Sequence, residues 1–156
     1  MSLVLAIAQH EREGYPAGEE HWALVTASST TSQGQVFQVV GNTDTYGYNT
    51  KTVIIRASQH LCGGVAIGEV PAQNVEWLKT YLSTAVTIVH GNPNWHCQRW
   101  VIEAIRKLQE ETSMVTIYPN FSERAVRARL SKERDSWEDG DDHFFDTFVP
   151  APPVKH

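Results

Sequence analysis

The feature that most constrains the fold is a change of pattern near Pro71. Before this residue, short runs rich in β-branched and aromatic side chains are bounded by turn-forming residues, which is typical of strands. After it, apolar residues recur three and four positions apart, as they do along one face of a helix. Strands followed by helices, rather than alternating with them, favour the α+β class, with an antiparallel sheet packed against helices.

The same patterns predict the individual elements. Five strands are expected, at 2–9, 21–28, 35–42, 51–58 and 63–70. No helix of useful length is expected before Pro71, and three are expected after it, at 71–86, 96–111 and 119–135. Asn120 and Glu123 have the spacing of a capping box at the start of the third helix.

Composition narrows the classes of function. The 156 residues are enough for one domain that buries its own core, which we place at 1–135, followed by an acidic, aromatic tail at 136–156 that ends rich in proline. The net charge of −5 argues against nucleic acid as the main partner. Two cysteines are too few for a disulfide framework, and no apolar run reaches membrane-spanning length. We therefore expect a soluble cytoplasmic protein with reduced thiols and no membrane span.

The last part of the chain has two interpretations. The third predicted helix is rich in arginine and the tail is rich in acidic residues, so a solvated basic helix and a frayed tail are one possibility. The other is that the tail docks on this domain or on a second copy, which would make a homo-oligomer. Its anchors would be Trp137, Phe144, Phe145 and Phe148.

Cys97 opens the second predicted helix and is open to two interpretations. It starts an apolar stripe with Val101, Ala104, Ile105 and Leu108, so it can be a small buried hydrophobe. It also lies in the first helical turn, where free N–H groups and the helix dipole stabilise an anion. A thiolate there is a better nucleophile near neutral pH. This second interpretation requires Asn94 or a neighbour as the helix cap.

His21 is the candidate base for that thiol. It begins the second predicted strand, and a hairpin about the Ser28–Ser32 loop would bring it close to Gln38, on the same face of the sheet. Gln38 is the polar residue of an otherwise apolar strand. A thiol, an imidazole and an amide that orients the imidazole make a complete nucleophilic constellation. The alternative is that both residues lie on an exposed strand face.

Two segments resemble motifs of a known superfamily, HWALV at 21–25 and NWHCQRWV at 94–101. They are similar to the circularly permuted NlpC/P60 branch of papain-like thiol hydrolases. Lecithin:retinol acyltransferase-like proteins carry a similar HWA segment early and an NCEHFV-like segment late, and PPPDE peptidases also place histidine before cysteine. An uncharacterised set of fungal proteins is closer still, with an HWAL strand, a YQV-GN-like strand and an NCQ-WV helix. The resemblance covers roughly residues 20–110.

The resemblance implies a permuted papain-like fold in which Cys97 matches the nucleophile and His21 the general base. Gln38 falls near the third polar position, which is a histidine in the acyltransferase-like proteins. The implied chemistry is cysteine-dependent hydrolysis or acyl transfer at an amide, isopeptide or ester bond of a peptide, protein or acylated substrate. No cofactor and no metal are implied.

Residues beside the thiol and base are candidates for the substrate cleft: Trp22, Asn94, Trp95 and His96. The resemblance departs from its motif here, because Asn94-Trp95-His96 stands where a single asparagine precedes the cysteine. The backbone N–H of Cys97, at the helix N-terminus, would help to stabilise an oxyanion.

Two rival functions remain. A metal site could draw on His60, Cys62, His90, His96 and Cys97, but the HLC and HC spacings are not those of structural zinc sites. A catalytically silent binding or scaffold module that keeps the fold is the second rival, and the departure at Gln38 favours it.

Overall fold

A single six-stranded antiparallel sheet forms the centre of the computed structural model, which describes residues 1–140. The strands are β1 (Ser2–His10), β2 (His21–Ala27), β3 (Gln33–Val40), β4 (Gly47–Ile54), β5 (Leu61–Pro71) and β6 (Thr116–Ile117). Their order across the sheet is β4-β3-β2-β1-β5-β6, and every neighbouring pair is antiparallel. The predicted α+β class is therefore confirmed.

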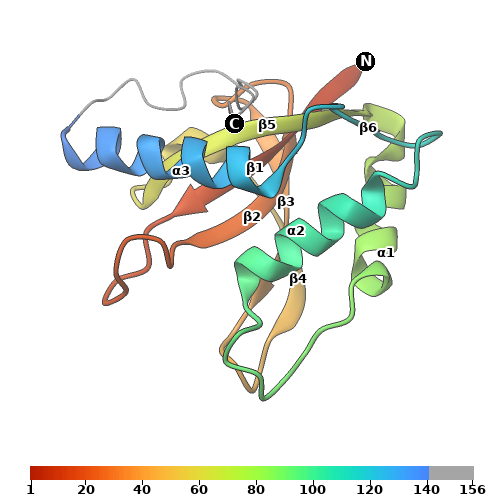
Figure 1. Cartoon of the computed structure of the whole chain (residues 1–156). Helices are drawn as coiled ribbons and strands as arrows, with labels where there is room; N and C mark the ends of the chain where they lie inside the picture. Colours follow the sequence, from red (N-terminus) through yellow and green to blue (C-terminus); the bar gives the residue numbers. More distant parts are fainter. Residues whose placement is uncertain (141–156) are drawn as a thin grey trace.

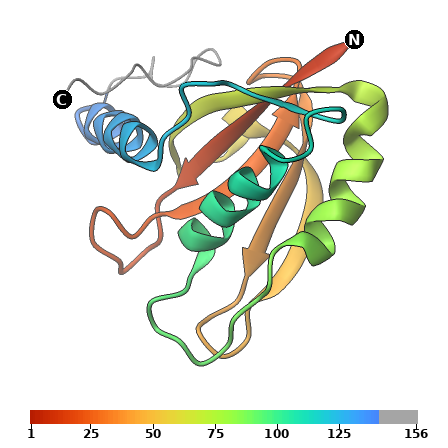
Figure 2. The same ribbon diagram turned by 45° about the vertical axis from the view of Figure 1, so that its right-hand side comes forward.

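Three helices pack on this sheet, α1 (Val75–Ala85), α2 (Cys97–Leu108) and α3 (Glu123–Glu138). Figures 1 and 2 show α1 and α2 on the same face of the sheet, and α3 alongside β5. Two short 3₁₀ turns, Ile55–Ala57 and Ala72–Asn74, flank β5. The prediction that no long helix precedes Pro71 is confirmed within the described residues.

The main core lies between the sheet and the helices. Alternation along β2 and β3 turns Trp22, Leu24, Phe37 and Val39 toward the helices, and all four are buried. The apolar stripe of α2 meets them, as its spacing predicted. The stripe residues are Cys97, Val101, Ala104, Ile105 and Leu108, each no more than 2% exposed. The position of Cys97 at the first turn of α2 therefore follows from how this stripe packs.

A second, smaller core lies on the opposite face of the sheet. Its sheet residues include Ala6, Ala8, Ala23 and Leu61, and Ile55 packs against them from the connection between β4 and β5. Because several of these side chains are alanines, the apolar layer on this face is thin. Within residues 1–140, Ile55 from the β4–β5 connection and Trp137 near the end of α3 help to cover that face.

Several predicted boundaries were wrong for identifiable reasons. The strand expected at 51–58 begins earlier, because β4 pairs with β3 from Gly47 to Ile54. The Asn120–Glu123 capping box is absent. Instead Ser122 caps α3, and its hydroxyl accepts a hydrogen bond from the backbone N–H of Ala125 at 3.0 Å. β6 was missed because two residues are too few to show a period.

Helix α3 crosses the boundary at residue 135 that the sequence suggested for the domain. Trp137 is on this helix, where it packs against the second core and lies under the Arg134 guanidinium, 5.3 Å from its ring centre. One of the four proposed aromatic anchors is thus docked on the domain. Phe144, Phe145 and Phe148 lie outside the described residues. Among the described helices, none has the length and apolar character needed to cross a membrane.

Gly63 marks the closest approach of α3 to the sheet. Its φ is +151°, and a Cβ atom built there would lie 2.5 Å from the Cβ of Glu133. We expect Gly63→Ala to lower the free energy of unfolding by about 1–3 kcal/mol, because α3 must move or the backbone must strain. Gly47→Ala is the control, since a Cβ there meets nothing within 4 Å. Urea unfolding curves that coincide for the two variants would contradict this account.

Candidate active site

Strands β2 and β3 separate where the candidate site lies. Their pairing joins Leu24–Thr26 to Gln35–Phe37, so it stops three residues short of His21. Beyond Leu24 and Phe37 the strand ends diverge, and a gap opens at the end of the sheet. His21 and Gln38 both line this gap.

A side-chain hydrogen bond bridges the separated strands. His21 Nε2 lies 2.7 Å from Gln38 Oε1. The Gln38 amide is itself fixed from β4, because its Nε2 donates to Asn49 Oδ1 at 3.1 Å. With the Gln38 NH₂ group pointing at Asn49, its oxygen must accept the proton of His21 Nε2. The expected neighbours, His21 and Gln38, are therefore in contact, and the neutral His21 ring keeps its lone pair on Nδ1.

The surroundings of His21 keep the ring neutral. Burial is the main cause of a His21 pKa below the ordinary value of 6.5. The hydrogen bond with Gln38 acts in the opposite direction, and the positive charges of Arg12 and Lys51 lower the pKa further. A neutral imidazole at pH 7 is the form that a general base requires.

Cys97 is the first residue of α2 and packs against the start of β2. Its Sγ lies 3.9 Å from the backbone oxygen of Glu20, the residue directly before His21. The helix cap is His96, whose Nδ1 accepts from the backbone N–H of Gln98 at 3.3 Å. The cap is thus a neighbour of Asn94, and the thiol lies in the first turn, where the helix dipole favours an anion.

Cys97 and His21 lie on opposite sides of the sheet but line one cleft. Strand alternation places His21 and Gln38 on the face of the smaller core, whereas Cys97 belongs to the helix side. The gap between β2 and β3 joins the two sides in a cleft of about 340 Å³. All three residues predicted as the catalytic centre line this cleft.

Tyr46 also lines the cleft, and the sequence reasoning missed it. Burial, and then the charge of Cys97, raise the pKa of the Tyr46 hydroxyl, so it stays a hydrogen-bond donor. Its ring packs edge-on against Trp95 with ring centres 5.7 Å apart. The signal in the sequence was weak, because the TYGY segment reads as a turn.

Gln98 is the second residue that the sequence reasoning missed. It is only 2% exposed, and its Nε2 donates to the backbone oxygens of Gly18 at 3.1 Å and Glu20 at 2.9 Å. Its Oε1 accepts from Arg127 of α3 at 2.7 Å. The side chain therefore fastens the start of α2 to the segment that ends at His21. A glutamine directly after the candidate nucleophile was the available signal.

A buried ion pair supports the same segment from α3. Arg134 is 7% exposed and pairs with Glu20 at 3.0 Å and with Glu11 at 3.4 Å. Glu20 in turn accepts from the backbone N–H of Gly18. For Arg134, the interpretation of α3 as a solvated basic helix is wrong.

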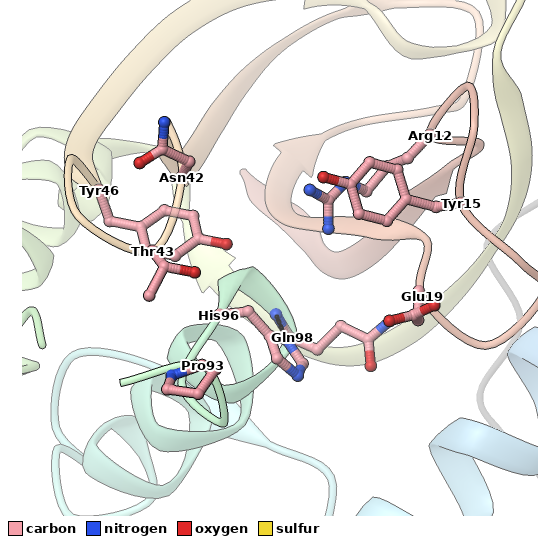
Figure 3. Close-up of a pocket in the computed structure, with 9 residues that line it drawn as sticks. All are labelled: Arg12, Tyr15, Glu19, Asn42, Thr43, Tyr46, Pro93, His96 and Gln98. Carbon is pink, nitrogen blue, oxygen red and sulfur yellow. Dashed lines mark hydrogen bonds between the residues drawn. The ribbon is translucent and has the colours of Figure 1, made fainter. Parts of the chain in front are cut away.

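The four candidate cleft residues have different locations. Trp22 and Trp95 are in the main core, and the indole of Trp95 donates to Glu103 at 3.3 Å. Asn94 is exposed, and its backbone N–H donates to Asn92. His96 lines a smaller polar pocket beside the cleft (Figure 3).

The second cysteine contrasts with Cys97. Cys62 is fully buried, and burial raises the pKa of its thiol to about 12. Both cysteines are free thiols. Residues 1–140 contain no group of three or more histidine, cysteine or acidic side chains arranged to hold a metal ion.

Comparison with known proteins gives one family. The model of a family of unknown function, DUF6540, matches residues 7–115, which is well over half of the chain. No curated protein and no solved structure matches the sequence. The match ends before α3, so Arg127 and Arg134 lie outside it.

His10 provides a test of how this region tolerates acid. It lies opposite His21 with ring centres 6.4 Å apart, and its Nδ1 is buried with no hydrogen-bond partner among residues 1–140. Burial, and then the charges of His21, Lys51 and His60, lower its pKa from 6.5 to about 4. The unfolded chain therefore takes up this proton first as the pH falls.

The contribution of neutral His10 to the unfolding free energy should be fully present above pH 6.5 and be lost as the pH falls toward about 4. We expect His10→Gln to remove about 3 kcal/mol of the loss in unfolding free energy between pH 7 and pH 4. Urea unfolding at both pH values measures this, with His60→Gln, an exposed histidine, as the control. An unchanged acid loss in His10→Gln would show that His10 is not the group responsible.

Gln98→Ala should loosen the segment before His21. It leaves Arg127 without one acceptor and the Glu20 oxygen without one donor, so we expect a loss of about 1–3 kcal/mol in unfolding free energy. Hydrogen exchange at Gly18–His21 should also become faster. Gln109→Ala, at the exposed end of the same helix, is the control and should change neither. Unaltered exchange in Gln98→Ala would mean that the amide does not hold this segment.

Proposed function

The chain belongs to the DUF6540 family, and we propose that it is a cysteine-dependent hydrolase or acyltransferase acting on an amide, isopeptide or ester bond. One observation carries the proposal. A first-turn cysteine and a histidine oriented by an amide line a single cleft, although 76 positions separate them in the sequence (97 minus 21). A peptide, a protein or another acylated molecule would be the substrate.

In the first step His21 Nδ1 takes the proton of the Cys97 thiol, and the sulfur attacks the substrate carbonyl carbon. An S–C bond forms and the carbonyl oxygen becomes an oxyanion. The backbone N–H of Cys97 and the Tyr46 hydroxyl are the donors proposed to stabilise it. The carbonyl then re-forms, the bond to the leaving group breaks, and His21 gives its proton to the leaving amine or alcohol.

In the second step a water or an acceptor alcohol or amine attacks the thioester. His21 removes the proton of the attacking group, and Cys97 leaves as the thiolate, which is then reprotonated. Gln38 keeps the ring in the tautomer with Nδ1 free throughout, because its oxygen holds the Nε2 proton. Hydrolysis and acyl transfer differ only in the group that attacks the thioester.

A permuted papain-like arrangement is part of the proposal. Its support is the chain order, in which the base on β2 precedes the nucleophile at the start of α2, together with an antiparallel sheet packed against that helix. Two free thiols support a reducing compartment such as the cytoplasm.

The test is trapping of an acyl-enzyme. Incubation with p-nitrophenyl acetate should release nitrophenolate in a burst and add one acetyl group to the peptide that contains Cys97. We expect Cys97→Ala to abolish the burst and His21→Gln to slow it by about 10²- to 10⁴-fold. Cys62→Ser is the control and should retain the burst. Acetylation that is equal at both cysteines, or absent from Cys97, would favour a catalytically silent binding module.

The pH dependence gives a second check on the base. Because the His21 pKa lies below 6.5, the acylation rate should stay high at pH 6.5 and fall only in more acidic buffer. Gln38→Ala removes the hydrogen bond that raises this pKa, so its acid midpoint should shift lower still while the rate drops. A midpoint above 6.5 would exclude His21 as the base in this environment.

A further inference from the structure

The lining of the Cys97 cleft is positively charged in a protein that is acidic overall. Besides the catalytic candidates, the cleft is lined by Arg12 and Lys51, and no carboxylate is among its lining residues. The chain as a whole carries a net charge of −5. Two cations at one cleft of such a chain are therefore a local feature that its overall charge does not explain.

Arg12 is held in place without being neutralised. Its guanidinium stacks on the Tyr15 ring, 3.8 Å from the ring centre, and no salt bridge to it exists within residues 1–140. A stacked guanidinium keeps its fork of N–H donors available for an anion. The Arg12 guanidinium is thus preorganised to bind an anion.

Arg12 also lines the small polar pocket beside the cleft. Figure 3 shows Arg12 and Tyr15 together on one side of this pocket, with Asn42, Thr43 and Tyr46 on another. The pocket has a volume of about 140 Å³ and includes one carboxylate, Glu19. Since Arg12 and Tyr46 line both spaces, the pocket adjoins the cleft that contains Cys97.

Both cations act on His21, the proposed base. The charges of Arg12 and Lys51 each lower the pKa of His21, which places them within electrostatic reach of the base. Lys51 is exposed and lies on β4, whereas Arg12 lies in the connection between β1 and β2, so the two cations come to the cleft from different segments of the chain. An anion bound between them would be adjacent to the scissile bond.

We propose that the cleft selects acyl substrates that carry an anionic group, a carboxylate or a phosphate, close to the bond that Cys97 attacks. Arg12 binds this group and Lys51 contributes a second positive charge. The proposal rests on the proposed function, whose substrate class it narrows. Arginine suits the role because its planar fork binds either oxyanion with two parallel hydrogen bonds.

A matched pair of alkylating agents tests the proposal without knowledge of the natural substrate. Iodoacetate and iodoacetamide transfer groups of nearly the same size to a thiolate, with loss of iodide, but only iodoacetate is negatively charged. The rate of each at Cys97 is measured by peptide mass spectrometry and divided by its rate with N-acetylcysteine. The normalised ratio of iodoacetate to iodoacetamide should exceed one.

Variants assign the effect to the two cations. We expect Arg12→Gln to lower the normalised ratio by about three- to tenfold, the effect of one partly screened charge at close range, and Lys51→Gln to lower it less. Lys107→Gln removes an exposed charge at the other end of α2 and is the control. Circular dichroism verifies that each variant is folded, and either cleft variant suffices for the comparison.

The outcomes separate the two proposals. If Cys97 reacts with both reagents but the ratio is near one and insensitive to both variants, the anionic substrate class is wrong and the thiol hydrolase remains. If Cys97 reacts with neither reagent, the proposed function fails and the substrate class with it. A separate protection experiment distinguishes a carboxylate from a phosphate. Glutarate and inorganic phosphate are compared at equal ionic strength by how well each protects Cys97 from iodoacetamide. Protection by neither would also overturn the proposal.

Discussion

The site depends on the point where β2 and β3 stop pairing. In a continuous sheet, His21 and Gln38 would be separated by the sheet itself from Cys97, because they point to the face opposite α2. The pairing ends at Leu24 and Phe37, and the strand ends are joined beyond it only through side chains, with His21 bonded to Gln38. Loss of backbone pairing thus creates the opening through which a helix-side thiol and a residue of the other face share one cleft.

A gap between two strands of a sheet stays open only if contacts with other elements fix the strand ends. Here Gln98 and Arg134 fasten the segment before His21 to α2 and α3, and their hydrogen bonds to Glu20 are buried. Buried hydrogen bonds to charged groups resist disruption because an unpaired partner would be costly. Helix α3 lies beyond the residues that match the family model, so in this chain the support of the site draws on a region outside that match.

The sequence predicted those parts of the structure that repeat. The period of two assigned the correct faces to Trp22 and His21, and the helical stripe placed Cys97 at the start of a buried face. It could not predict where strand pairing ends, because backbone hydrogen bonds carry no side-chain signature. The choice of Ser122 over Asn120 as a cap, and the burial of Gln98, depend on tertiary contacts for the same reason. Trp95 packs in the main core, and an aromatic residue beside a thiol fits a core as well as a cleft, so the sequence alone could not choose between the two locations.

The electrostatics of the site follow from this architecture. His21 and His10 are both desolvated by burial, which disfavours their cationic forms before any neighbouring charge is considered. Arg12 and Lys51 lower the pKa of His21 further, so the cleft carries positive charge while this imidazole stays neutral. One arrangement therefore meets two needs that usually conflict. The base keeps its lone pair, and the cleft keeps two positive charges that can attract an anion beside Cys97.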